Sequence, residues 1–153
     1  MTLSICDNAP DFDVTSSDGR HLKLGDFRGK KNVVLYFYPG DFTPVCTRET
    51  CGFRDMMAEL ANANTEVIGV SFDDDESHEA FREKHKVEFA LVADIPHGLA
   101  EKYEATNMLT RLLGRPSRVT YVIDKNGRIA GVFKAELSAS THLDGVRDCV
   151  SKL

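Results

Sequence analysis

The stretch that decides the fold covers residues 33–55 and reads VVLYFYPGDFTPVCTRETCGFRD. It begins with aliphatic and aromatic residues, and Pro39-Gly40 ends that run, which predicts a buried strand. Thr43 suits the N-cap of a following helix, and Pro44 suits its first position. Because good helix formers continue to about Ala63, we predict one helix over residues 44–63.

Cys46 falls in the first turn of this helix, just beyond the carboxyl end of a central strand. A thiol attacks only as its thiolate, and a helix N-terminus with a nearby cation lowers a thiol pKa from about 8.5 to roughly 3.5–7.5. The unpaired N–H groups of the first turn and the helix dipole both favour an anion. The same donors can stabilise an oxyanion that leaves during a reaction. Cys46 is therefore the candidate nucleophile.

Cys51 lies five residues further along the same predicted helix. On an ideal helix this spacing separates the two Cα atoms by about 8.6 Å. A disulfide needs Cα atoms within about 6.8 Å. The two sulfurs can therefore pair only if the first turns unwind, and the pair would act as a redox switch.

The pattern Pro39-x-x-x-Thr43-x-x-Cys46-x-x-Glu49 closely resembles the active-site signature of the peroxiredoxins. The added Cys51 resembles the bacterioferritin-comigratory, or peroxiredoxin Q, branch of that family. Several residue types recur here at fixed spacing within a strand, a turn and a helix, which makes the pattern specific.

The resemblance covers most of the chain, from residues 9–12 (APDF) to residues 118–124 (RVTYVID). It implies an α/β, thioredoxin-like fold. One departure is Val45, where this branch often carries a small residue. The departure concerns the packing beside the thiol and leaves the chemistry unchanged.

The resemblance also implies a thiol peroxidase that reduces hydrogen peroxide and organic hydroperoxides. Cys46 would become a sulfenic acid, and Cys51 would condense with it to form an intramolecular disulfide. Thioredoxin or a thioredoxin-like protein would restore the dithiol. Thr43 would offer its hydroxyl to the thiolate or the peroxide, and Pro39 would shield the pocket. No metal, flavin or haem is needed, so we expect no cofactor.

A cation beside the thiolate is also required, and the residues alone leave several candidates, namely Arg48, Arg54, Arg111, Arg115 and Arg118. Only the resemblance selects Arg118, at the start of the strand that reads RVTYVID. It likewise suggests that Glu49 orients this arginine through a charge-assisted hydrogen bond. Taken alone, Glu49 would be a solvated first-turn acid.

The bulk composition predicts one globular domain over residues 1–153, since 42% of the residues are hydrophobic. A net charge of −5 and the absence of a basic run argue against nucleic acid as a partner. The apolar runs are too short to span a membrane, and no long apolar surface stripe demands a partner. We therefore expect a monomer or a weak homodimer.

The cysteine usage and the absence of a visible signal peptide favour a cytoplasmic protein with reduced thiols. The alternative is a peroxisomal protein, since Ser151-Lys152-Leu153 matches the peroxisomal address. Cys6 is expected on a surface loop. Cys149 is expected to pack as a small apolar residue, although a resolving role for either thiol stays open.

The remaining chain alternates strands and helices. We predict an N-terminal hairpin, strands at 66–72, 89–93, 118–124 and 128–134, and helices after residues 73–76, near 99–103 and from about 141. Residues 106–117 are expected to form a loop or a broken helix. Acids at 73–76 are expected to cap their helix. This order implies a mixed central sheet flanked by helices. His21, His78, His85 and His142 are all expected at the surface.

Two other functions fit the same residue types. A thiol–disulfide oxidoreductase usually places its cysteines as Cys-x-x-Cys, whereas four residues separate Cys46 from Cys51. A structural zinc module prefers short Cys-x-x-Cys and His-x-x-x-His pairs, and the sequence has none. A thiol peroxidase therefore explains the pattern best.

Overall fold

The computed structural model describes residues 3–94, 98–106, 110, 112 and 114–153. In chain order the elements are β1 (Asp13–Thr15), β2 (His21–Lys23), α1 (Leu24–Phe27), β3 (Asn32–Phe37), α2 (Pro44–Asp55), α3 (Met57–Asn62), β4 (Thr65–Ser71), α4 (Asp75–His85), β5 (Ala90–Ala93), α5 (Gly98–Lys102), β6 (Val119–Ile123), β7 (Ile129–Lys134) and α7 (Ala139–Ser151). The predicted strands and the N-terminal hairpin are confirmed within about one residue at each end.

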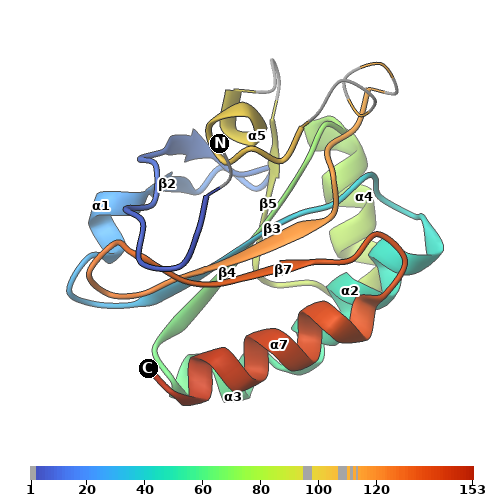
Figure 1. Cartoon of the computed structure of the whole chain (residues 1–153). Coiled ribbons are helices and arrows are strands. Elements are labelled where there is room, and N and C mark those ends of the chain that lie inside the picture. Colours follow the sequence, from blue (N-terminus) through green and yellow to red (C-terminus); the bar gives the residue numbers. More distant parts are fainter. Residues whose placement is uncertain (1–2, 95–97, 107–109, 111, 113) are drawn as a thin grey trace.

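A mixed sheet with the order β5-β4-β3-β6-β7 forms the centre of the molecule (Figure 1). β3 lies between a parallel neighbour and an antiparallel one, so that Leu35 pairs with Ile68 on β4 and with Tyr121 on β6. β1 and β2 form a separate antiparallel hairpin. The expected α/β architecture is thus confirmed.

Every residue of β3 is buried, because the sheet is covered on both faces. Alternate side chains of β3 enter two different cores. Val33, Leu35 and Phe37 pack with the hairpin and α5, whereas the core on the opposite face contains Val34 and Tyr36 together with residues of α2, α3, α4 and α7. The carboxyl end of β3 therefore leads directly to the face on which α2 lies.

The single helix predicted over residues 44–63 is wrong, because the helix is interrupted at Met56. The amide of Met56 donates to the carbonyl oxygens of both Gly52 and Phe53, which tightens the turn at the end of α2. Phe53 before the break and Leu60 after it are both buried in the same core. Burial of side chains on both segments thus outweighs the continuous helical propensity of the sequence.

α7 runs alongside α2 and α3 (Figure 1) and also packs on β7. Gly52 permits the close approach of α2 to α7, and Gly145 permits that of α7 to β7. A Cβ at Gly52 would lie 2.3 Å from a methyl carbon of Leu143, and one at Gly145 would lie 2.5 Å from the Phe133 ring. Gly145 lowers the intrinsic helix propensity of α7. It is present because a side chain at this position would clash with the Phe133 ring. α7 begins two residues earlier than predicted, because Ser138 caps it by accepting from the amide of Thr141.

Helix α1 was not predicted, since Leu24–Phe27 is too short to show a helical period. Asp74 caps α4 as expected by accepting from the amide of Ser77. The loop or broken helix predicted at 106–117 lies partly outside the described residues. No helix in the described part of the chain combines the length and the apolarity needed to cross a bilayer.

Candidate active site

The site begins where the chain leaves β3 and enters α2. Thr43 occupies the N-cap position, but its hydroxyl donates to the carbonyl of Gly40 at 2.9 Å. The side chain makes no capping hydrogen bond to the helix. The first helical bond runs from the amide of Thr47 to the carbonyl of Thr43. Helix geometry therefore leaves the N–H groups of Val45 and Cys46 without an intrahelical acceptor, beside the sulfur.

The loop before α2 is anchored by a buried carboxylate, that of Asp41, whose side chain is 1% exposed. Asp41 accepts from the hydroxyls of Tyr38 at 2.7 Å and Ser77 at 2.8 Å, and it lies 2.8 Å from Nδ1 of His78. The prediction that His78 is solvated is wrong, since its side chain is fully buried. Its partner Asp41 is remote in sequence. His78 and the buried Phe81 lie on the same face of α4. Their spacing in the sequence could have indicated that His78 is also buried.

Phe42 fixes the outer side of the same loop. Its φ is +64°, a left-handed conformation that is rare for a bulky residue. The ring packs edge-on against Phe81 with centroids 5.1 Å apart, and Nζ of Lys84 lies 5.6 Å from its centroid. Polar and aromatic contacts thus hold the loop on α4.

Arg118 reaches the sulfur of Cys46 from the start of β6. Its Nη2 donates to Sγ at 2.9 Å, and its Nη1 donates to Oε1 of Glu49 at 2.8 Å. Nε donates to the carbonyl of Glu136 at 3.0 Å. The Arg118 side chain is 3% exposed and its guanidinium is held at all three nitrogens, so its charge is fixed against the sulfur.

The structure therefore brings together the sequence-predicted residues Cys46, Glu49 and Arg118. Of the other candidate cations, Arg48 and Arg115 are exposed, and Arg54 binds Asp55 and the carbonyl of His85. Arg111 lies outside the described residues.

Glu49 is fully buried, whereas the residue taken alone was expected to be a solvated first-turn acid. Burial raises the pKa of Glu49 to about 7, although the charge of Arg118 opposes the shift. Its Oε2 has no hydrogen-bond partner among the described residues. Nδ1 of His142 lies 3.4 Å from Oε2.

His142 was predicted at the surface, which is wrong, since its side chain is fully buried. Nε2 donates to the carbonyl of Ala135 at 3.0 Å, and Nδ1 lies 2.7 Å from Oγ1 of Thr120. Burial lowers the pKa of His142, and the charge of Arg118 lowers it further. His142, Val146 and Val150 share one helix face, a spacing that could have revealed this histidine.

The four cysteines are all free thiols in different environments. Cys46 is fully buried, Cys51 is partly exposed on α2, and Cys6 is exposed. Cys149 packs partly buried, with its sulfur 3.5 Å from the carbonyl of Ala130, and burial raises its pKa. The amide of Cys6 binds the carbonyl of Ile129, so Cys6 and Cys149 both lie along β7.

Pro39 and Thr43 are half-buried in the segment that leads from β3 to the first turn of α2, which carries Cys46. Because Cys46 has no exposed surface, a substrate reaches Sγ only when the surrounding loop or side chains move aside. Oγ1 of Thr43 gives its proton to Gly40 and keeps lone pairs that can accept from a hydroperoxide O–H. The site suits a small substrate that carries a hydroxyl group.

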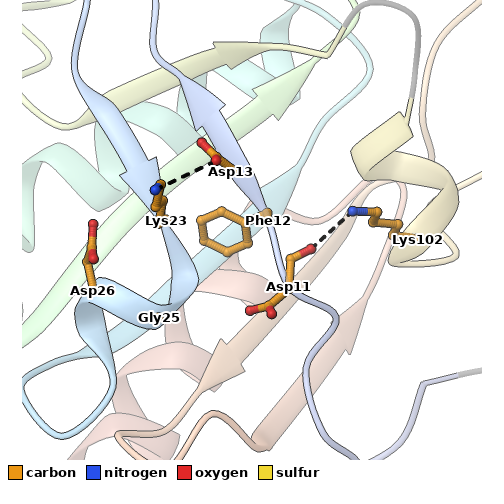
Figure 2. A pocket seen from close by; sticks show the side chains of 7 residues that line it. All are labelled: Asp11, Phe12, Asp13, Lys23, Gly25, Asp26 and Lys102. Atoms are coloured by element: carbon orange, nitrogen blue, oxygen red, sulfur yellow. Dashed lines mark hydrogen bonds and ion pairs between the residues drawn. The ribbon is translucent and has the colours of Figure 1, made fainter.

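A surface pocket of about 340 Å³ lies elsewhere, at the base of the N-terminal hairpin (Figure 2). Its lining includes the carboxylates of Asp11, Asp13 and Asp26 and the amines of Lys23 and Lys102, with Phe12 at its floor. No cysteine lines it. Among the described residues, no group of three or more His, Cys, Asp or Glu side chains is placed to hold a metal ion.

The chain is similar in sequence to a known protein family and to several known proteins. The profile of the AhpC/TSA family matches residues 5–132. Peroxiredoxin Bcp of Bacillus subtilis is 42% identical over 133 residues, which are 84% of this chain and 83% of the relative. Chloroplastic peroxiredoxin Q of Sedum lineare is 39% identical over 88% of this chain and 71% of the relative. The chain spans only 62% of the corresponding Suaeda salsa protein, at 38% identity.

The solved structures agree with the sequence matches. The crystal structure of peroxidoxin BcpB from Mycobacterium tuberculosis has a TM-score of 0.89 at 28% identity, covering 99% of this chain and 98% of that one. A variant of Xylella fastidiosa PrxQ has a TM-score of 0.88 at 24% identity, with the same coverage, a likeness that concerns the fold.

Proposed function

The chain belongs to the AhpC/TSA family and is a peroxiredoxin of the Bcp and peroxiredoxin Q branch, and we propose that Cys46 is the cysteine with which it attacks hydroperoxides. The observation that carries this proposal is the 2.9 Å hydrogen bond from Nη2 of Arg118 to Sγ of Cys46. A buried guanidinium held on three sides stabilises an anionic sulfur, which is the reactive form.

In the first step the Cys46 thiolate attacks one oxygen of the hydroperoxide. The S–O bond forms and the O–O bond breaks, so the sulfur is oxidised to a sulfenic acid. The other oxygen leaves as hydroxide or alkoxide and takes a proton from water. The N–H groups of Val45 and Cys46 and the guanidinium of Arg118 supply donors for the negative charge that develops on this oxygen.

Thr43 and Pro39 complete the proposed site. The hydroxyl oxygen of Thr43, oriented by its bond to Gly40, accepts from the O–H of the incoming peroxide. Pro39, half-buried at the end of β3, shields the sulfur from water and fixes the loop. Glu49 holds Arg118 in place through its 2.8 Å hydrogen bond.

Cys51 is proposed to resolve the sulfenic acid. Both cysteines lie within the continuous helix α2, in which they are too far apart to bond. The first turns must therefore unwind before the Cys51 thiolate displaces hydroxide from the Cys46 sulfur, with loss of water after protonation. Oxidation removes the thiolate charge that Arg118 stabilises, and this loosens the contact between α2 and β6.

Thioredoxin or a thioredoxin-like dithiol is the proposed reductant, because the partly exposed Cys51 is open to attack by an external thiolate.

We further propose a single domain over residues 1–153 that acts as a monomer or weak homodimer in the cytoplasm. The names of the two plant relatives include the word chloroplastic, and the names of the relatives described above give the peroxisomal alternative no support.

Mass spectrometry after one equivalent of hydrogen peroxide, with peptide mapping, tests this proposal. We expect a Cys46–Cys51 disulfide in the native protein and a sulfenic acid on Cys46 in Cys51→Ser. Cys46→Ser should lose peroxide turnover. Unchanged thioredoxin-dependent turnover in Cys51→Ser would refute the resolving role, and reduction of insulin without peroxide turnover would indicate a thiol–disulfide oxidoreductase.

A further inference from the structure

A fully buried histidine connects the loop before α2 with the central sheet. His78 extends from α4, and its Nδ1 lies 2.8 Å from Oδ2 of Asp41 in that loop. On the other side of the ring, Nε2 lies 3.2 Å from the carbonyl oxygen of Val92 on β5. The ring therefore bridges the segment that leads to Cys46 and a strand of the sheet.

Both nitrogens of this ring face an acceptor at hydrogen-bond distance. The carbonyl of Val92 can only accept, so Nε2 needs a proton. A carboxylate likewise only accepts, so a second proton must lie between Nδ1 and Oδ2 of Asp41. A neutral ring beside an ionised Asp41 has a single N–H and would leave one of these two contacts without a proton. The Asp41–His78 pair therefore holds two protons.

The longer contacts of the ring supply neither proton. Oγ of Ser71 lies 3.5 Å from Nε2, but its hydroxyl donates to Oδ2 of Asp73 at 2.9 Å. The hydroxyl of Tyr38 lies 3.3 Å from Nδ1 and donates to Oδ1 of Asp41 at 2.7 Å. Burial raises the pKa of Tyr38 well above its usual value, so this phenol stays protonated as a donor. Both protons must belong to the pair itself.

The charges around the pair favour an imidazolium over a neutral ring beside a protonated carboxyl group. The carboxylate of Asp41 accepts three hydrogen bonds, which suit its ionised form. The donors are Tyr38, Ser77 and the ring of His78. Asp73, which follows β4, adds a second carboxylate by accepting from the amide of Asp41 at 2.7 Å, and β5 contributes an uncharged carbonyl oxygen. Within the described residues, His78 is the one basic side chain in an ion pair with Asp41, and a buried carboxylate without a cation is costly.

We propose that His78 is a positioning residue for the Cys46 site, which it serves as an imidazolium that clamps the loop before α2. The clamp lies on the loop side of Thr43, whereas the segment that unwinds on oxidation begins at Pro44. Its contacts come from the ends of β3 and β4, from β5 and from α4, and loss of the thiolate charge leaves them unchanged. The loop therefore stays fixed while α2 unwinds and returns, and Cys46 regains the same position after each cycle. The inference rests on the proposed function, which it extends to the return of the helix.

¹⁵N NMR of the reduced protein at about pH 7 tests the protonation of the ring. We expect protons on both ring nitrogens of His78, and the ring of His142, whose pKa is lowered by burial, supplies the neutral reference in the same spectrum. In Asp41→Asn the new amide can donate to Nδ1, so the His78 ring should become neutral with its proton on Nε2. A neutral His78 ring in the native protein, or an imidazolium that persists in Asp41→Asn, would overturn the inference.

Residue-resolved amide hydrogen exchange in both redox states tests the clamp. The probe is the amide of Asp41, because it donates to Oδ2 of Asp73. In the native protein, oxidation with one equivalent of hydrogen peroxide should raise exchange across residues 44–53 and leave the Asp41 amide unchanged. The side chain in His78→Asn can donate to Asp41, but it carries no charge and is too short to reach Val92. In this variant the Asp41 amide should exchange about tenfold or more faster once the protein is oxidised.

His21→Asn, which changes an exposed histidine on the hairpin, is the matched control and should behave as the native protein does. Faster exchange at Asp41 in the oxidised native protein, or an unchanged rate in oxidised His78→Asn, would refute the clamp. The NMR measurement on the native, reduced protein needs neither a buried variant that folds nor any peroxide, so it tests the inference in every case. Absence of any reaction between the native protein and peroxide would instead refute the proposed function.

Discussion

Replacement of Glu49 by Gln should change how the stability of the protein depends on pH. Gln has nearly the same shape as a protonated Glu and can accept from Arg118, but it cannot ionise. In the native protein, burial raises the pKa of Glu49 from 4.5 to about 7, against the opposing influence of Arg118. The folded state therefore keeps a proton that the unfolded chain has released.

The sign and size of the effect follow from this difference. Between about pH 4.5 and 7 the folded state binds more protons at this position than the unfolded state, so the free energy of unfolding falls as the pH rises. A displacement of about 2.5 pH units corresponds to about 3 kcal/mol across the window. Glu49→Gln should therefore gain about 3 kcal/mol relative to the native protein as the pH rises from about 4.5 to 7.5.

Urea unfolding of the reduced proteins, followed by far-ultraviolet circular dichroism at several pH values, measures this difference. Glu59→Gln is a matched control, because Glu59 forms an exposed ion pair with Arg147 and should show a nearly constant difference. A constant difference between the native protein and Glu49→Gln would refute the reasoning. A difference that falls with rising pH would mean that Arg118 stabilises an ionised Glu49 more than burial disfavours it.

The remaining predictions concern the loop, the helix packing and the redox change. Gly52→Ala should lower the free energy of unfolding by about 1–3 kcal/mol, because its Cβ would lie 2.3 Å from a methyl carbon of Leu143. Gly25→Ala, with open space around it, should cost far less in the same urea experiment. Asp41→Asn should cost about 1–3 kcal/mol and slow the reaction of Cys46 with peroxide, because the buried hydroxyl of Tyr38 and the ring of His78 would face an amide instead of the carboxyl group. An unchanged rate would show that this anchor does not position the site. Peroxide treatment should raise amide hydrogen exchange across residues 44–53, and equal protection in both redox states would contradict the unwinding of α2.

The sequence predicts much of this fold because its strands and turns are locally encoded. The apolar run ended by Pro39-Gly40 and the Asp74 cap each determine a structure within a few residues. The break at Met56 is not local. It depends on which side chains reach the core, and helix propensity does not contain that information.

The residues of the site also differ in whether local sequence or the tertiary fold determines their place. Cys46 and Thr43 stand in one turn of α2, whereas Arg118 comes from a distant strand and was selected through the family resemblance. His78 and His142 were wrongly expected at the surface, because a polar residue on a helix suggests solvent until its buried partner is known. Those partners, Asp41 and Glu49, lie 37 and 93 residues away in sequence and only the tertiary fold brings them close.

The pH dependence with which Cys46 reacts with iodoacetamide tests the central claim most directly. Rapid quenching and peptide mapping measure the alkylation rate of each cysteine separately in the native protein and in Arg118→Gln. If Arg118 holds the sulfur as an anion, the Cys46 rate in the native protein has already reached its plateau at about pH 7, and in Arg118→Gln it continues to rise toward about pH 8.5. A rate at Cys46 that rises through about pH 8.5 in the native protein, as for an ordinary free thiol, would contradict the account.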